Sequence, residues 1–237
     1  MGLLTQNSEL KPDGIWNWTL PAWQVKLSNG TWFNACPQAC ACVNLCYARN
    51  GTYLFPNVKA KHLDNLERTL SDLWKWQEDM IADIKSHKKI TYVRIHDAGD
   101  FYSDDYLQAW LDIAALVPAV TFYCYTKEVS RFKAMVEGNC PKNFKYLYSL
   151  GGKEDHLINR ENDRHAEVFP DSAALNAAGY MNQTKSDLLA ITLPTNKIGI
   201  EANNIKHFRK KQGAETFGSL QATRDDKKNL RRLNPGK

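Results

Sequence analysis

The architecture of the chain is set by residues 90–126, ITYVRIHDAGDFYSDDYLQAWLDIAALVPAVTFYCYT, in which two apolar strands flank one amphipathic helix. Ser103 is placed to cap this helix at its start, and Pro118 ends it. The alternation continues with a helical stretch over 127–137 and a third apolar strand over 144–150. Strands that follow one another through helical crossovers lie parallel in one sheet. The sequence therefore predicts an α/β fold with a mostly parallel sheet.

The rest of the chain adds shorter elements around this unit. Asn29-Gly30 between two short apolar runs is a strong hairpin signal. Leucines and isoleucines that recur every three or four residues predict one long helix, or two in tandem, over 58–88. Further expected elements are a strand within 15–23, hairpin strands over 24–27 and 31–33, a short capped helix over 171–178, and final strands over 188–192 and 198–202.

Polar residues follow each of the three predicted parallel strands at its carboxyl end, where α/β proteins build their sites. Catalytic candidates in these loops are His96, Asp97, Asp100, Lys127, Asp155 and His156. Candidates for contacts to a cofactor are Gly99, Ser149, Gly151 and Gly152. Paired glycine amides can approach a carboxylate or a phosphate, although glycine also serves simple turns.

Residues 36–51, CPQACACVNLCYARNG, contain four of the six cysteines. Thiols at this density indicate a metal centre, and thiolates suit iron-sulfur clusters, zinc or Cu(I). Zinc sites usually show two separated pairs of ligands, which this stretch lacks. Cys40 and Cys42 are one residue apart and would point in opposite directions in an extended chain. We therefore expect Cys36, Cys42 and Cys46 to hold a four-iron, four-sulfur cluster with one open iron, and Cys40 stays an open alternative ligand.

Charge is distributed unevenly along the 237 residues, whose net charge is +5. Residues 203–237 contain ten Lys or Arg and three Asp or Glu, a net charge of +7. We expect residues 1–202 to form a single α/β iron-sulfur domain and residues 203–237 a partly disordered basic tail that contacts nucleic acid. The expected location is a reducing cytoplasm, because free thiols are numerous and neither a secretion leader nor a long apolar run is found.

Four segments together resemble the gene product 88 family of bacteriophages: LTQNS at 4–8, the cysteine stretch to Arg49, RIHDAGDFY at 94–102, and SLGG at 149–152 with Asp155-His156. The layout is similar to that of radical S-adenosylmethionine enzymes, which hold a cluster in a cysteine loop on a partial (β/α) barrel. Those enzymes usually show C-x3-C-x2-C, whereas here the spacing is Cys36-x5-Cys42-x3-Cys46. The resemblance implies a cytoplasmic location within a host cell.

The resemblance implies that S-adenosylmethionine binds at the open iron, with the loop 96–100 near its amine and Gly151-Gly152 near its ribose or carboxylate. Tyr47, directly after Cys46, would supply an aromatic wall. The leading hypothesis is a radical S-adenosylmethionine-like enzyme that acts on a substrate the sequence does not identify. The alternative is a non-enzymatic iron-sulfur protein that binds nucleic acid or a partner in phage replication or host takeover. A zinc-stabilised hydrolase ranks third.

Overall fold

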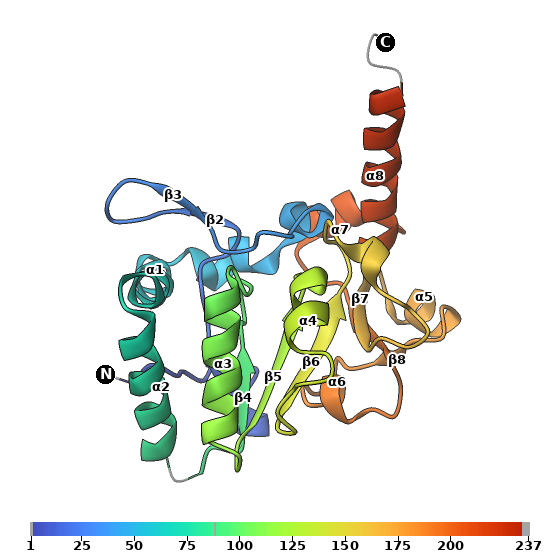
Figure 1. The fold of residues 1–237 in the computed structure, drawn as a ribbon. Helices are drawn as coiled ribbons and strands as arrows, with labels where there is room; N and C mark the ends of the chain where they lie inside the picture. The colour runs from blue at the N-terminus through green and yellow to red at the C-terminus, as the bar shows by residue number, and fades with distance from the viewer. Residues whose placement is uncertain (1, 88, 234–237) are drawn as a thin grey trace.

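A computed structural model describes residues 2–87 and 89–233 and shows a seven-stranded sheet with helices packed against it (Figure 1). The strands lie in the order β1-β4-β5-β6-β7-β9-β8, and every neighbouring pair is parallel. Their bounds are β1 (Ile15–Trp18), β4 (Tyr92–Ile95), β5 (Thr121–Thr126), β6 (Phe144–Ser149), β7 (His165–Phe169), β8 (Met181–Asn182) and β9 (Lys197–Glu201). The prediction of a mostly parallel α/β fold is confirmed.

The sheet has β1 at one edge and β8 at the other. Among residues 2–87 and 89–233 no strand pairing joins these two edges, so no closed barrel is formed there. Thr5 and Asn17 make a single antiparallel bridge on the outer side of β1. The partial barrel implied by the resemblance stays a prediction.

The described residues form eight α-helices, and Figure 1 shows α3 and α4 on one face of the sheet and α8 projecting from the body. Their bounds are α1 (Pro56–Ser71), α2 (Leu73–Ser86), α3 (Asp104–Leu116), α4 (Val129–Met135), α5 (Ser172–Ala177), α6 (Leu189–Thr192), α7 (Lys206–Gln212) and α8 (Phe217–Leu233). Short 3-10 turns add η1 (Lys11–Asp13), η2 (Ala41–Leu45), η3 (Tyr47–Arg49), η4 (Gly51–Leu54) and η5 (Asp155–Leu157).

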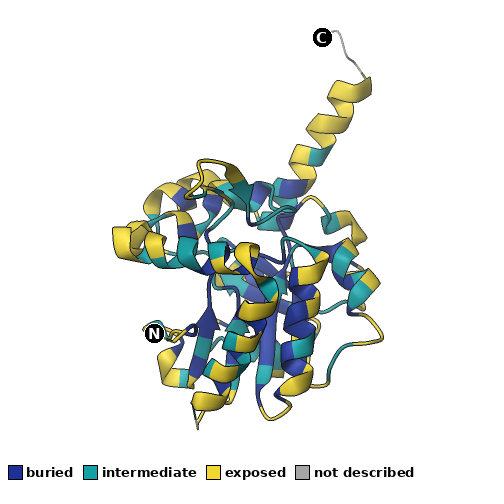
Figure 2. Cartoon of the chain, turned by 60° about the vertical axis from the view of Figure 1, so that its left-hand side comes forward, coloured by how far each residue is buried: buried dark blue, intermediate teal, exposed yellow. Residues whose placement is uncertain are grey.

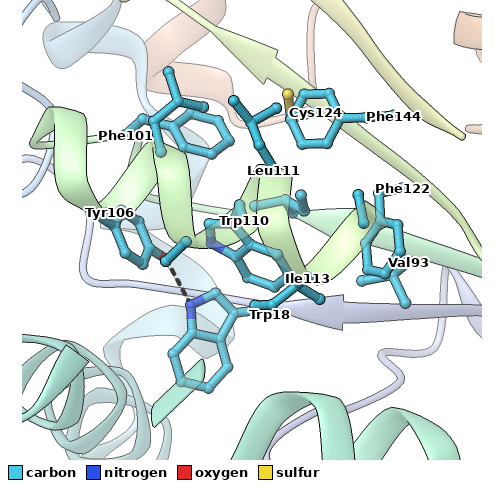
Figure 3. Packing of buried hydrophobic residues seen from close by; sticks show 14 of the residues in the cluster. Trp18, Val93, Phe101, Tyr106, Trp110, Leu111, Ile113, Phe122, Cys124 and Phe144 are labelled. Atoms are coloured by element: carbon cyan, nitrogen blue, oxygen red, sulfur yellow. Dashed lines mark hydrogen bonds between the residues drawn. The ribbon is translucent and has the colours of Figure 1, made fainter. Parts of the chain in front are cut away.

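The main core lies between the sheet and helices α2 and α3 (Figure 3). Val93 and Ile95 alternate along β4 and are fully buried, as is Phe122 on the neighbouring strand β5. Trp110 of α3 is also fully buried in this cluster. Alternation along the strands and a three-to-four spacing along the helix therefore bring one apolar face of each together.

The long helical stretch predicted over 58–88 is two helices in tandem. Asp72 interrupts the helical backbone, and its carboxylate accepts a hydrogen bond from the Lys75 amide at 2.9 Å. This side chain therefore caps α2 at the point where α1 ends.

Residues 188–192 were predicted as a strand, but Leu189–Thr192 form helix α6, with Leu188 just before it. The Leu188 carbonyl accepts hydrogen bonds from the amides of Ile191 and Thr192 and from the Thr192 hydroxyl. Pro194 follows the helix after one intervening residue. The apolar residues of this segment pack a short helix on the sheet. An apolar run of this length is equally compatible with a strand and with a helix, so the sequence does not distinguish them.

Strand β7, which the sequence analysis did not include, begins at the polar residue His165. The buried His165 ring bonds the Asp163 carbonyl and the Tyr180 hydroxyl, each at 2.8 Å. In the tail, Lys206–Gln212 and Phe217–Leu233 form α7 and α8. Residues 234–237 lie outside the described ranges, and the expected partial disorder of the tail stays a prediction. Figure 2 shows buried residues at the base of α8 and exposed ones along the part that leaves the body.

The predicted hairpin is confirmed as β2 (Gln24–Lys26) paired antiparallel with β3 (Trp32–Asn34). The cysteine segment follows its second strand directly. No helix in the described ranges has both the length and the apolar character needed to cross a membrane.

Candidate metal centre

The cysteine segment 36–46 lies across the carboxyl ends of the central strands and is fixed there by backbone hydrogen bonds. The Asp100 amide, which follows β4, donates to the Ala35 carbonyl at 2.8 Å. The Cys42 amide donates to the Gly151 carbonyl, just after β6, at 3.1 Å. The segment is therefore seated at the edge of the sheet where the sequence predicted a site.

The loop between β5 and α4 contributes a side chain that the sequence analysis missed, Glu128. Its Oε1 accepts the Gln38 amide at 3.1 Å, and its other oxygen pairs with Arg131. Burial and, next, the nearby Asp100 carboxylate raise the pKa of Glu128 to about 8, while Arg131 opposes both. Glu128 directly follows Lys127 at a strand end, so its position was the signal that could have identified it.

Three thiols of the segment share one environment. Burial raises the pKa of Cys36, the Asp100 carboxylate raises it further, and the Cys46 and Cys42 thiolates add smaller increases because like charges repel. Burial likewise raises the pKa of Cys46, with Cys42 as the next cause. The Trp23 amide donates to Cys36 Sγ at 3.3 Å. Cys40 occupies the position before η2 and is not among the groups that affect these two thiols most.

Lys127 places a positive charge near the Cys42 and Cys46 thiols. Burial raises the pKa of Cys42, and the Lys127 ammonium is the strongest opposing influence. The same ammonium opposes the raised pKa of Cys46. Its position is fixed by Ser149, whose carbonyl and hydroxyl accept hydrogen bonds from Nζ at 3.0 and 2.7 Å. The structure thus brings two residues predicted for the site, Lys127 and Ser149, beside the thiols.

Asp100 faces the protein interior beneath the segment. Its carboxylate accepts hydrogen bonds from the Lys127 amide at 2.9 Å, the Thr126 hydroxyl at 2.7 Å and the Phe101 amide at 2.9 Å. Burial raises the pKa of Asp100, and these hydrogen bonds oppose the shift. In this arrangement the carboxylate joins the ends of β4 and β5.

The two glycines after β6 have their amides occupied by Asp155. Its carboxylate oxygens accept the amides of Gly151 at 2.7 Å and Gly152 at 2.8 Å. Gly151 has φ +100°, and a Cβ there would lie 3.2 Å from Phe217 Cβ and 3.4 Å from Cys42 Cβ. Glycine is therefore required at this position for the close approach of the cysteine segment and α8.

Tyr47 and Asp97 are joined on the other side of the segment. The Tyr47 hydroxyl donates to the Asp97 carbonyl, and the Tyr53 hydroxyl donates to the Asp97 carboxylate at 2.8 Å. The Asn7 amide group donates to the same carboxylate at 2.9 Å, and Arg94 lies 3.4 Å away. Tyr47, which directly follows Cys46, thus links the end of the cysteine segment to the loop after β4.

Three predicted site residues lie apart from the thiols. His96 is buried, and its Nε2 lies 2.9 Å from the Tyr106 hydroxyl. Gly99 has φ +88°, and a Cβ there would lie 2.5 Å from Leu20 Cβ, so this glycine permits close packing. His156 is exposed on η5.

Helix α8 supplies two contacts to the cysteine segment that were not predicted. Gln221 is buried, and its Oε1 accepts the Ala41 amide at 3.0 Å. Arg224 donates to the Cys40 carbonyl at 3.2 Å. These contacts join positions about 180 residues apart in the chain.

Within residues 2–87 and 89–233, no three His, Cys, Asp or Glu side chains are grouped as ligands of a single metal ion. Ligands of an iron-sulfur cluster bind different irons, so their sulfurs need not meet at one point. Cys36, Cys42 and Cys46 are each partly exposed while sharing one environment. These three thiols are the side chains that could hold a cluster, and the cluster itself stays a prediction.

Comparisons with known proteins agree on one family. A family model described as gene product 88 matches residues 2–232. The chain is 30% identical over 112 residues to the gene 88 protein of Mycobacterium phage D29, a match that covers 44% of this chain and 46% of that relative. The match therefore spans about half the length of this curated relative. No solved structure matches the chain.

Proposed function

The chain belongs to the gene product 88 family, and we propose that it is an iron-sulfur protein whose cluster is held by Cys36, Cys42 and Cys46. The proposal is supported by the shared environment of these three thiols over the carboxyl ends of parallel strands. The Cys40 carbonyl accepts a hydrogen bond from Arg224, and the Cys40 thiol stays an alternative ligand. Three cysteines on a four-iron cluster leave one iron for a small molecule.

The proposed activity is that of a radical S-adenosylmethionine-like enzyme, with S-adenosylmethionine at the open iron. The carboxyl edge of a parallel sheet is where α/β enzymes bind small molecules, which supports this choice. When bound, such a cluster supplies one electron to the ligand on its open iron.

Side chains around the cysteine segment would position the cluster ligands and balance their negative charge. The Lys127 ammonium offsets the negative charge of the Cys42 and Cys46 thiolates, and Ser149 holds it in place. Tyr47 fixes the end of the cysteine segment through the Asp97 carbonyl. These residues orient the ligands of the cluster.

The first test is electron paramagnetic resonance of the anaerobically reconstituted, dithionite-reduced protein, with iron and sulfide analysis. We expect a reduced-cluster signal that shifts when S-adenosylmethionine is added. Replacing Cys36, Cys42 or Cys46 by alanine should abolish the signal, because each would hold one iron. Cys40→Ala should retain it, and so should the matched control Cys140→Ala, which removes a partly exposed thiol outside the segment.

Two results would contradict the proposed ligands and cluster, and a third would contradict only the proposed enzyme activity. Loss of the cluster in Cys40→Ala but not in Cys42→Ala would show that the ligand set is different. Stoichiometric zinc in place of iron would exclude the cluster. A cluster signal that S-adenosylmethionine does not shift would leave the iron-sulfur protein and exclude the enzyme.

That last outcome would favour a second candidate, a non-enzymatic protein in which the cluster is structural or senses redox state. The contacts of Gln221 and Arg224 with the cysteine segment favour this candidate, because they connect the proposed centre to a helix that leaves the body of the protein. In such a protein the state of the cluster would act on a partner of α8.

A further inference from the structure

The part of α8 that leaves the body of the protein carries a dense group of cations (Figures 1 and 2). The group, here called the basic stripe, consists of exposed side chains: Arg224, Lys227, Lys228, Arg231 and Arg232. They lie together on one open stretch of the helix surface. Their charged groups are therefore accessible to an anionic partner.

The spacing of the five residues places them on one side of the helix. They stand at i, i+3, i+4, i+7 and i+8, which at 3.6 residues per turn confines them to a sector of about 140°. Leu230, Leu233 and Asp226 point away from this sector by the same arithmetic. One continuous cationic face results.

The base of α8 is held rigidly, so this face has a defined direction. The Glu167 carboxylate, on β7, accepts the Gly218 amide at 3.1 Å and the Thr216 hydroxyl. Thr216 and Ser219 cap the helix reciprocally, with amide-to-hydroxyl distances of 2.9 and 3.1 Å. Gln221 adds the buried contact to Ala41.

We propose that the basic stripe of α8 binds the phosphodiester backbone of a nucleic acid. Five cations on one face complement a row of phosphates, and neutralising phosphates releases condensed counterions. A membrane surface would require a broad apolar face beside the charge, whereas the exposed apolar side chains of this helix are Leu230 and Leu233 near its end. This inference does not depend on the proposed cluster.

The test measures binding of labelled DNA and RNA of about 20 nucleotides, single-stranded and duplex, by fluorescence anisotropy between about 50 and 200 mM salt. The variant is Lys227→Glu/Lys228→Glu. Its matched control is Lys59→Glu/Lys85→Glu, which makes the same charge change at exposed lysines of α1 and α2. Circular dichroism checks that each variant keeps its helix content.

Wild type and control should bind with affinity that falls steeply with salt. The stripe variant should bind at least about tenfold more weakly at about 50 mM salt, and its slope of log K against log salt should be smaller by about 2, because two phosphate contacts are lost. The DNA and RNA arms show which backbone is preferred.

Three outcomes would overturn the proposal. One is absence of nucleic-acid binding by the wild-type protein at low salt. Another is equal weakening in the stripe variant and the control, which would mean that net charge alone is responsible. The third is binding to phosphatidylserine vesicles, lost in the stripe variant, without binding to DNA or RNA. Each result is independent of iron content and so is separable from failure of the cluster proposal.

Discussion

His96 lies at a strand end but is engaged in the core rather than at the thiols. Its backbone has φ +67°, its ring packs against Phe101 with centroids 4.6 Å apart, and burial lowers its pKa to about 3. Trp18 Nε1 donates to the Tyr106 hydroxyl at 2.9 Å (Figure 3). The same Tyr106 hydroxyl lies 2.9 Å from His96 Nε2 and so links the indole to the imidazole within the core.

We predict that this buried neutral ring makes stability depend on pH. The folded pKa lies below the usual 6.5, so the contribution is full above about pH 6.5 and is lost as pH falls toward 3. Asparagine tolerates positive φ, so His96→Asn should keep the backbone conformation. We expect this variant to lack the decrease of about 3–5 kcal/mol in unfolding free energy that the wild type shows between about pH 6.5 and pH 3. Urea unfolding at several pH values measures the difference, with His156→Asn as the exposed control. Parallel pH profiles for wild type and His96→Asn would contradict it.

Residues of the candidate site differ in how far the sequence could identify them. The thiols were recognisable because four cysteines within one short segment have few structural uses. Lys127 and Ser149 were recognisable by their place after apolar strands. Glu128 and Gln221 act as acceptors for the amides of Gln38 and Ala41, and nothing local shows which distant amide will come within reach.

At the scale of elements, the sequence predicted those with a clear period. The alternation in 90–126 and the leucine spacing in 58–88 gave β4, α3, β5, α1 and α2 with small shifts at the ends. Strand β7 was missed because its polar residues are satisfied by side chains and amides from other elements. Helix α6 was mistaken for a strand because four or five apolar residues carry no decisive period.

Of the two side chains that join helix α8 to the cysteine segment, Gln221 makes the buried contact. We predict that Gln221→Leu lowers the free energy of unfolding by about 1–3 kcal/mol, because the buried Ala41 amide loses its acceptor. Hydrogen exchange should show faster exchange at Ala41. The control Gln108→Leu makes the same change at an exposed position of α3. Equal effects of the two substitutions would show that the contact contributes nothing specific.

At the scale of the whole molecule, segments far apart in sequence meet around Arg94. Its guanidinium lies 3.4 Å from Asp97 and 3.2 Å from Asp187, and it stacks over the ring of Tyr125 at 5.1 Å. Asp187 also accepts the Tyr123 hydroxyl. The adjoining residues extend this contact to the start of the chain, because the Ser186 hydroxyl donates to Asp13 at 2.6 Å and Asn7 donates to Asp97 at 2.9 Å.

This network covers the face of the sheet away from α3. Its coupling energy can be compared with that of an exposed ion pair. Breaking a buried pair leaves a charge without compensation, so Arg94→Met should cost about 3–5 kcal/mol. In a double-mutant cycle with Asp187→Asn we expect a coupling energy of about 1–3 kcal/mol. The exposed pair Arg68 and Asp64, 2.9 Å apart on α1, should couple by only about 0.3–0.5 kcal/mol. If urea unfolding gave the same coupling energy for both cycles, the Arg94–Asp187 pair would contribute no more than an exposed pair. Apolar packing, and not this network, would then hold the start of the chain to the sheet.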